Sequence, residues 1–188
     1  MINFYTATKT IKGKEYTAQF NGISAALKAV DDSYIEGSKN TSVYKLAKYL
    51  FENVIVDPKL DIDDFGAEMI GEEKTKQIGD VEYVARFNGL SKALKAIDGC
   101  YIEGTGNTSI EKLAAYILDN VVVKPAKLTI DDFQSMNEFN EVIEFAREVM
   151  QGGDIMNEFN EVVNFAQEVM QGNFRNGENR KSIKKASK

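Results

Sequence analysis

An internal repeat constrains the fold of this chain more than any other feature. The stretch Tyr16–Val56 returns as Tyr83–Val123, 67 residues further along, without a gap and with identical residues at 25 of 41 positions. Such a repeat indicates one structural unit that occurs twice. A body of about 60 residues is near the lower limit for independent folding, so we expect each copy to be stabilised by contacts with the other copy or with a partner.

Charge and composition limit the class of protein. The chain has 188 residues, of which 43% are hydrophobic and 28% charged, and a net charge of −6. An acidic body has no electrostatic attraction for nucleic acid or for an anionic membrane surface. No segment approaches the ~18 apolar residues of a membrane span, and the N-terminus lacks a run of signal-peptide length. Cys100 is the one cysteine, which is consistent with a reducing compartment. We expect a soluble, cytoplasmic protein.

Each copy begins with a pattern typical of a β-hairpin. In the first copy, β-branched and aromatic residues over 2–20 lie on both sides of Lys12-Gly13. In the second copy, a similar run over 75–87 lies on both sides of Gly79-Asp80. Extended segments on either side of a glycine turn predict two antiparallel strands joined by a tight turn.

A first helix is predicted after each hairpin. Apolar residues recur there at spacings of three and four, as on one face of a helix. Gly37 and Gly104 stand where a helix commonly ends in a left-handed residue. The predicted inner positions are Ile23, Ala26, Leu27, Val30 and Tyr34 in the first copy, and Leu90, Ala93, Leu94, Ile97 and Tyr101 in the second.

A second helix and an apolar run complete each copy. The helix is predicted to begin at Asn40-Thr41-Ser42 and at Asn107-Thr108-Ser109, and in the second copy Thr108 and Glu111 have the spacing of a capping box. The apolar run that follows, 54–56 or 121–123, precedes a proline. It is either a short strand or an extended connection.

A shorter motif is then duplicated. MNEFNEVIEFAREVMQG at 136–152 and MNEFNEVVNFAQEVMQG at 156–172 differ at three positions, and Gly152-Gly153-Asp154 separates them. Their apolar residues recur at helical spacing and predict two amphipathic helices.

The apolar stripe of each motif has two interpretations. A stripe at helical spacing is commonly core, whereas Met-rich faces also bind apolar partner helices. Two near-identical stripes cannot both fill one groove of one domain, so at least one is a candidate for partner binding. The candidate partner-binding residues are Met136, Phe139, Val142, Ile143, Ala146 and Met150 in the first motif, and Met156, Phe159, Val162, Val163, Ala166 and Met170 in the second.

The predicted fold class is α+β. Two tandem repeats, each a β-hairpin with two helices and a short extended segment, are followed by two C-terminal amphipathic helices and a disordered basic tail. The predicted boundaries are 1–66 for the first repeat, 67–74 for a linker, 75–134 for the second repeat, 135–172 for the duplicated helices and 173–188 for the tail. The tail carries six basic residues against Glu178, and a solvated extension is favoured over nucleic-acid binding.

The sequence contains no recognisable pattern of catalytic or metal-binding residues. The chain has no histidine, which removes the commonest general base, the histidine-activated nucleophiles and most zinc sites. Asp57, Asp61, Asp63 and Asp64 form a cluster, but half of it is missing from the second copy. An Asp pair at a helix N-terminus is the favoured interpretation, and neither phosphate-loop pattern occurs. We therefore predict no catalytic residue, no metal and no cofactor.

The succession of motifs resembles a known family. The segments GKEYTAxF, ALKAxDxxYIEG, NTSxxKLAxYxxxNVxV, LxIDDF and MNEFNEVxxFAxEVMQG cover most of the chain. Together they resemble the tail assembly chaperones of long-tailed bacteriophages and prophages of Gram-positive hosts. The usual pattern of that family is one α+β unit followed by one helical segment. Here both parts are doubled.

The resemblance implies a non-enzymatic role in the cytoplasm of the bacterial host. Such chaperones bind the apolar tape measure protein, keep it soluble, help to bring the tail tube protein onto it, and leave before the virion is complete. Self-association is a further possibility. The alternative is a structural tail component retained in the virion, such as a tube or tail-completion protein. A carboxylate-dependent hydrolase is a remote third hypothesis.

Overall fold

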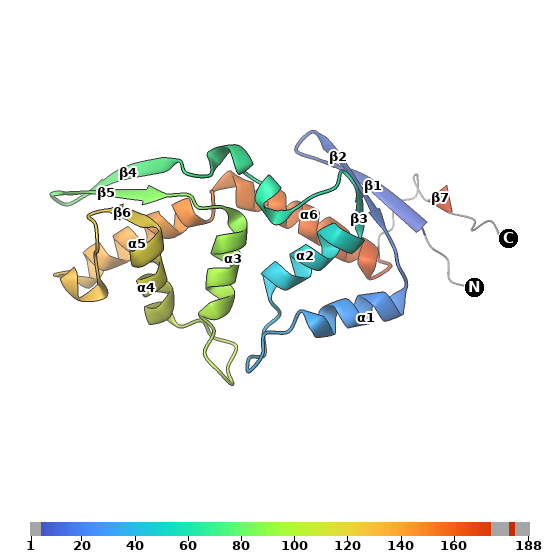
Figure 1. Cartoon of the computed structure of the whole chain (residues 1–188), viewed down its shortest axis with the longest axis horizontal. Helices are drawn as coiled ribbons and strands as arrows, with labels where there is room; N and C mark the ends of the chain where they lie inside the picture. The colour runs from blue at the N-terminus through green and yellow to red at the C-terminus, as the bar shows by residue number, and fades with distance from the viewer. Residues whose placement is uncertain (1–4, 174–180, 183–188) are drawn as a thin grey trace. The chain divides into compact units, whose positions relative to one another are not determined.

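The computed structural model describes residues 5–173 and 181–182. Over these residues the chain forms six α-helices together with antiparallel sheets, so the predicted α+β class is confirmed (Figure 1). No helix in the described part of the chain combines the length and the apolar character needed to cross a membrane.

Both predicted hairpins are present. Strand β1 (Tyr5–Ile11) pairs antiparallel with β2 (Lys14–Gln19) across Lys12 and Gly13, whose φ angles are 48° and 80°. Positive φ at both central residues is the requirement of the commonest two-residue hairpin turn. Strand β4 (Glu73–Ile78) pairs in the same way with β5 (Val81–Arg86).

The apolar run that closes each copy is a short strand. Strand β3 (Ile55–Asp57) pairs with β2, and β6 (Val122–Lys124) pairs with β5, each with an irregularity in register. The first sheet has the order β3-β2-β1-β7 and the second β4-β5-β6. Strand β7 (Lys181–Ser182) adds two residues to β1. Apart from this strand and Asn173, the predicted disordered tail lies outside the described residues.

Four helices of equivalent length follow the hairpins: α1 (Ile23–Asp32), α2 (Val43–Asn53), α3 (Leu90–Gly99) and α4 (Ile110–Asn120). The first helix of each copy ends earlier than the glycines predicted. Gly37 and Gly104 do have φ near +72°, but in the loop beyond the helix. Tyr34 and Tyr101, predicted as helical, lie outside it in isolated β-bridges to Thr41 and Thr108.

Serine side chains cap the second helix of each copy. The Ser42 hydroxyl accepts a hydrogen bond from the Lys45 N–H, and the Ser109 hydroxyl accepts one from the Lys112 N–H. The predicted capping box of Thr108 and Glu111 is wrong, because the N-cap is Ser109 and the residue three positions later is Lys112.

Short 3-10 helices connect the larger elements: η1 (Ile62–Asp64), η2 (Ala67–Met69) and η3 (Ile130–Asp132). The Asp pairs of η1 and η3 stand in the first turn, as predicted. The predicted linker 67–74 carries η2 and the first residues of β4. Helices α5 (Met136–Met150) and α6 (Asp154–Met170) confirm the two predicted amphipathic helices.

The chain divides into two compact units. Within the described residues, unit 1 comprises 5–35, 41–64, 157–173 and 181–182, and unit 2 comprises 36–40 and 65–156. Helix α5 therefore belongs with the second body, whereas nearly all of α6 belongs with the first. The predicted sequential boundaries placed the two helices together in one segment.

Candidate functional site: the two motif helices

We refer to α5 and α6 as the motif helices, because they carry the duplicated motif. Helix α5 packs against β4, β5 and α4 of unit 2. The ring of Phe139 meets the ring of Phe133 edge to face at a centroid distance of 5.3 Å. The Lys76 ammonium lies 6.0 Å from the centre of the Phe145 ring, within the range of a cation–π contact. The apolar face of α5 is thus covered by its own unit.

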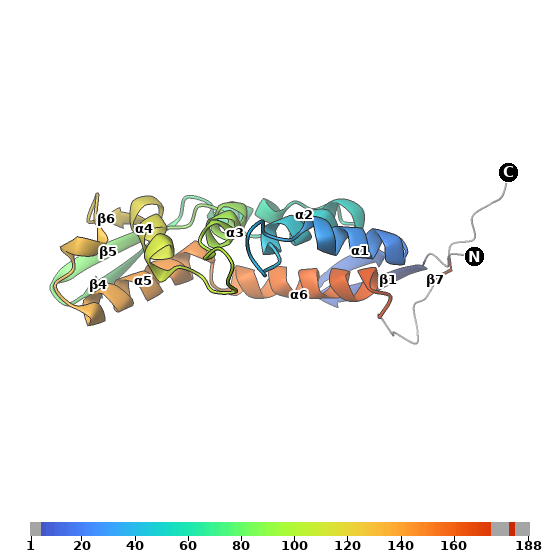
Figure 2. The ribbon, with the colours of Figure 1, turned by 90° about the horizontal axis from the view of Figure 1, so that it is seen from below.

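Helix α6 belongs to unit 1, where it runs beside α2 (Figure 2). The ring of Phe159 meets the ring of Phe51 of α2 edge to face, with centroids 5.9 Å apart and planes at 89°. At the far end, a Cβ placed on Gly172 would lie 3.6 Å from the Phe20 ring. The buried side chains of α6 run from Phe159 to its last residue, Met170.

A tyrosine–glutamate hydrogen bond docks each motif helix. In unit 1 the Tyr16 hydroxyl donates to Glu158 Oε1 at 3.0 Å, and in unit 2 the Tyr83 hydroxyl donates to Glu138 Oε1 at 2.8 Å. The two tyrosines hold the same position in the long repeat, and the two glutamates hold the same position in the motif. The two helices therefore dock on their bodies with the same polar anchor.

The anchor affects ionisation. Burial, with a further contribution from the Glu158 carboxylate, raises the pKa of Tyr16 to about 12. The same causes, with Glu138 as the carboxylate, raise the pKa of Tyr83 to about 12. In unit 1 the Lys14 ammonium also lies 3.3 Å from Glu158 Oε1. Both hydroxyls remain protonated donors throughout the neutral range.

The structure places most of the predicted partner-binding residues in the cores of the two units. Met136 is 69% exposed, and Ile143 and Met156 are half-buried. The stripe that the sequence left open between core and partner surface is core in the folded chain. Partner binding by these residues stays a prediction, and it requires the helix to leave its body. The buried members are Phe139, Val142, Ala146, Met150, Phe159, Val162, Val163, Ala166 and Met170.

An exposed apolar surface lies on α1 instead. Ile23 is 58% exposed and Leu27 is 62% exposed, one helical turn apart on the same face. Their counterparts in unit 2, Leu90 and Leu94, are 0% and 5% exposed. The prediction that Ile23 and Leu27 line the inner face is therefore wrong. No local signal distinguishes the two copies, because both carry aliphatic side chains at these positions.

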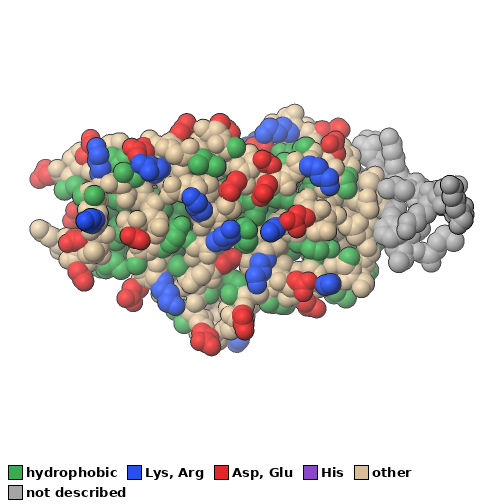
Figure 3. Space-filling model, in the orientation of Figure 1, with side chains coloured by type: hydrophobic (Ala, Val, Ile, Leu, Met, Phe, Trp, Pro, Cys, Tyr) green, Lys and Arg blue, Asp and Glu red, His purple; other side chains and the backbone are tan. Residues whose placement is uncertain are grey.

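A second exposed position is common to both units. Val43 begins α2 and is 42% exposed, and Ile110 begins α4 and is 75% exposed. Basic and acidic side chains are interspersed with apolar ones over the face drawn in Figure 3. Large exposed aliphatic side chains that recur at one position of a duplicated unit are candidates for partner contact.

The described residues offer little reactive chemistry. They contain no group of three or more side chains arranged to hold a metal ion. Asp64 accepts a hydrogen bond from the Asp61 N–H at 2.6 Å and so serves as a cap. Burial raises the pKa of the Cys100 thiol, which keeps it protonated and a poor nucleophile.

No protein-family model, no curated protein and no solved structure matches this chain. The functional conclusion therefore rests on its residues and its structure.

Proposed function

We propose that this chain is a tail assembly chaperone of a long-tailed bacteriophage or prophage and acts in the cytoplasm of the bacterial host. It binds the tape measure protein, keeps it soluble and promotes assembly of the tail tube protein, without enzymatic activity. One observation supports this most strongly. Helix α5 completes the body that directly precedes it, so unit 2 is one α+β body followed by one helical segment. This is the pattern that the sequence resemblance implies for one chaperone subunit.

The doubling then has a simple description, which is part of the proposal. Unit 1 has the same parts, namely a body and one motif helix, but unit 2 lies between them in the sequence. The chain thus corresponds to two chaperone subunits, one inserted into the other. The shared tyrosine–glutamate anchors, Tyr16 with Glu158 and Tyr83 with Glu138, support this equivalence.

The client surface that we propose is the exposed face of α1 with Ile23 and Leu27, together with Val43. Apolar side chains one turn apart on a helix fit the apolar face of another helix. A tape measure protein, which the resemblance implies to be long and apolar, offers many such faces. Covering them hides the surface through which the client aggregates, until tube subunits replace the chaperone.

Co-expression with the tape measure protein tests the proposal. The wild-type chain should raise the soluble fraction of the client and co-purify with it. Leu27→Asp should lose both effects, because it places a charge on the exposed apolar face of α1. Ser24→Asp is the matched control, since Ser24 is also exposed on α1 and gains the same charge without losing an apolar side chain.

Two results would contradict the proposal. A client that stays insoluble beside the folded wild-type chain would remove the chaperone activity. Stoichiometric presence of the chain in purified virions, measured by mass spectrometry, would favour a retained structural component. The motif phenylalanines are unsuitable probes here. Phe159 is 0% exposed and Phe139 is 9% exposed, so an aspartate at either site would unfold its unit.

A further inference from the structure

We propose that α6 is exchanged between copies of this chain, so that unit 1 of one molecule is completed by the α6 of a second molecule. The inference stands on the packing of α6 and on its connection to α5, and it does not depend on the chaperone proposal.

Unit 1 is assembled from two separated pieces of chain. Its body ends at Asp64, and its remaining helix begins only after the whole of unit 2. Tyr16 and Glu158, which anchor that helix, are 142 residues apart in the sequence. Unit 2 needs almost only its own contiguous residues, 65–156. A folded body 1 therefore keeps an open groove until some α6 reaches it.

The connection between α5 and α6 has the properties of a hinge. Three residues, Gln151 to Gly153, join the two helices, and the two glycines have φ of 70° and 57°. The turn is held by local bonds, in which the Gly152 N–H donates to the Val149 carbonyl at 3.0 Å and the Gly153 N–H donates to the Glu148 carbonyl at 3.3 Å. If these local bonds open, the turn frees α6 from the unit 1 body of its own molecule while α5 stays in unit 2.

A released α6 would expose its apolar face to water, which favours binding to another groove. Phe159, Phe165 and Val169 are each 0% exposed in the folded chain, so separation would place a wide apolar face in water. The groove that fits this face is the one on unit 1. A neighbouring copy offers the same Tyr16, Lys14 and Phe51 to the same Glu158 and Phe159. Exchange thus preserves the contacts of α6 with unit 1, and the hinge and the protein concentration decide between the two forms.

The twin helix of the same chain is a poor substitute. Helix α5 differs from α6 at only three motif positions, so its face is nearly the same. However, only three residues separate α5, which starts at Met136, from η3, and α5 packs on β4, β5 and α4 of unit 2. Its short connection ties it to that body. The second copy of the chain is therefore the partner that the structure favours.

Isotope mixing tests the exchange on the full chain. Ordinary and heavy-isotope-labelled protein are unfolded, mixed in equal amounts and refolded together at high concentration. A zero-length carbodiimide then couples Lys14 to Glu158, whose charged groups lie 3.3 Å apart. Mass spectrometry of the linked peptides should find pairs that join a light and a heavy chain, approaching half of all Lys14–Glu158 pairs. Lys48 and Glu52, 3.8 Å apart within α2, give a control that always joins one isotope.

If every Lys14–Glu158 pair joins a single isotope while the α2 control reacts, the proposal is overturned. The absence of any Lys14–Glu158 pair overturns it equally, since α6 would then not dock on unit 1 as described.

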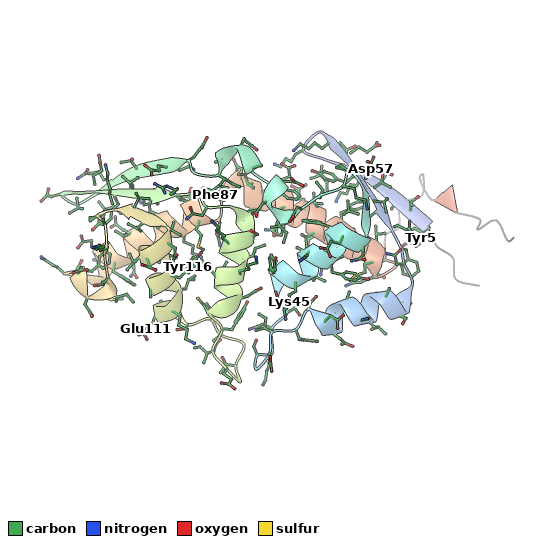
Figure 4. All side chains as sticks on the ribbon, viewed as in Figure 1. Tyr5, Lys45, Asp57, Phe87, Glu111 and Tyr116 are labelled. Carbon is green, nitrogen blue, oxygen red and sulfur yellow. The ribbon has the colours of Figure 1, made fainter. Side chains whose placement is uncertain are left out.

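A hinge variant gives an independent check. A Cβ on Gly153 meets nothing within 4 Å, so Gly153→Ala adds only left-handed backbone strain, which opening relieves. The exchange constant should rise roughly fivefold, the factor that corresponds to about 1 kcal/mol. Gly13→Ala is the matched control, because Gly13 has φ of 80°, an equally open site and no place in the hinge. An equal response of the two variants contradicts the proposed hinge. The neighbouring Gly152 is less suitable, since its Cβ would lie 3.1 Å from the Phe87 ring (Figure 4 labels Phe87).

Discussion

The hydroxyl of Tyr16 donates a hydrogen bond to Glu158 across 142 residues of sequence, at a distance of 3.0 Å. The same bond recurs between Tyr83 and Glu138 at 2.8 Å. These two bonds identify which motif helix belongs to which body. The two pairs are nested in the sequence, because the body that comes first pairs with the helix that comes last.

Removing the anchor should destabilise one unit at a time. Tyr16→Phe should lower the free energy of unfolding of unit 1 by about 1 kcal/mol, the usual net value of one hydrogen bond. Tyr83→Phe should act similarly on unit 2. Amide hydrogen exchange, which reports each unit separately, measures both effects. Tyr34→Phe is the control, since Tyr34 is 49% exposed. Equal behaviour of all three variants would show that the bonds contribute nothing.

The anchors also predict a loss of stability at alkaline pH. The folded pKa of Tyr16 and of Tyr83 is raised to about 12 from the ordinary tyrosine value of 10.0. Between these values the unfolded chain releases the proton and the folded chain keeps it, so stability is full below about pH 10 and falls as pH rises toward 12. Urea unfolding at several pH values measures the slope. The double variant Tyr16→Phe/Tyr83→Phe should flatten it, and an unchanged slope would contradict the assignment.

The motif stripe should behave as core. Phe159→Ala should lower the free energy of unfolding of unit 1 by about 3–5 kcal/mol, because it removes a fully buried ring and leaves a cavity. Met136→Ala in the other motif should change stability by less than about 0.5 kcal/mol, since Met136 is 69% exposed. Chemical unfolding followed by far-UV circular dichroism compares the two. A small effect of Phe159→Ala would indicate that α6 spends much of its time away from unit 1.

The cap of α4 should reside on one serine. Ser109→Ala should cost about 1 kcal/mol, because its hydroxyl accepts from the Lys112 N–H. Thr108→Ala should cost less, although Thr108 was the cap expected from the spacing to Glu111. Thermal unfolding of the two variants decides between them. A larger loss from Thr108→Ala would restore the capping box.

Local signals were sufficient for most of the secondary structure. Glycine turns between β-branched runs predicted both hairpins, and periodic apolar residues predicted all six helices of the described chain. The run at 54–56 stayed open between strand and connection, because a strand of three residues is defined only by its pairing partner. Strand β2 supplies that partner with an irregular register, and nothing within the run itself encodes it.

Local sequence patterns could not predict which motif helix packs against which unit. The two motifs are nearly identical, so their sequences do not show which body each helix packs against. Order along the chain suggests the wrong neighbour for α6. The same limit explains α1. Ile23 and Leu27 share their pattern with Leu90 and Leu94, yet only the second pair is covered. Periodicity identifies the apolar face of a helix but not what covers it.

Both proposals rest on the claim that α6 docks on a unit 1 body and α5 on a unit 2 body. The most direct measurement is a nuclear Overhauser spectrum of the dilute full chain with labelled phenylalanine rings. The structure predicts cross-peaks between Phe51 and Phe159, whose ring centres are 5.9 Å apart, and between Phe133 and Phe139 at 5.3 Å. Cross-peaks between Phe51 and Phe139 in place of Phe159 would contradict the claim.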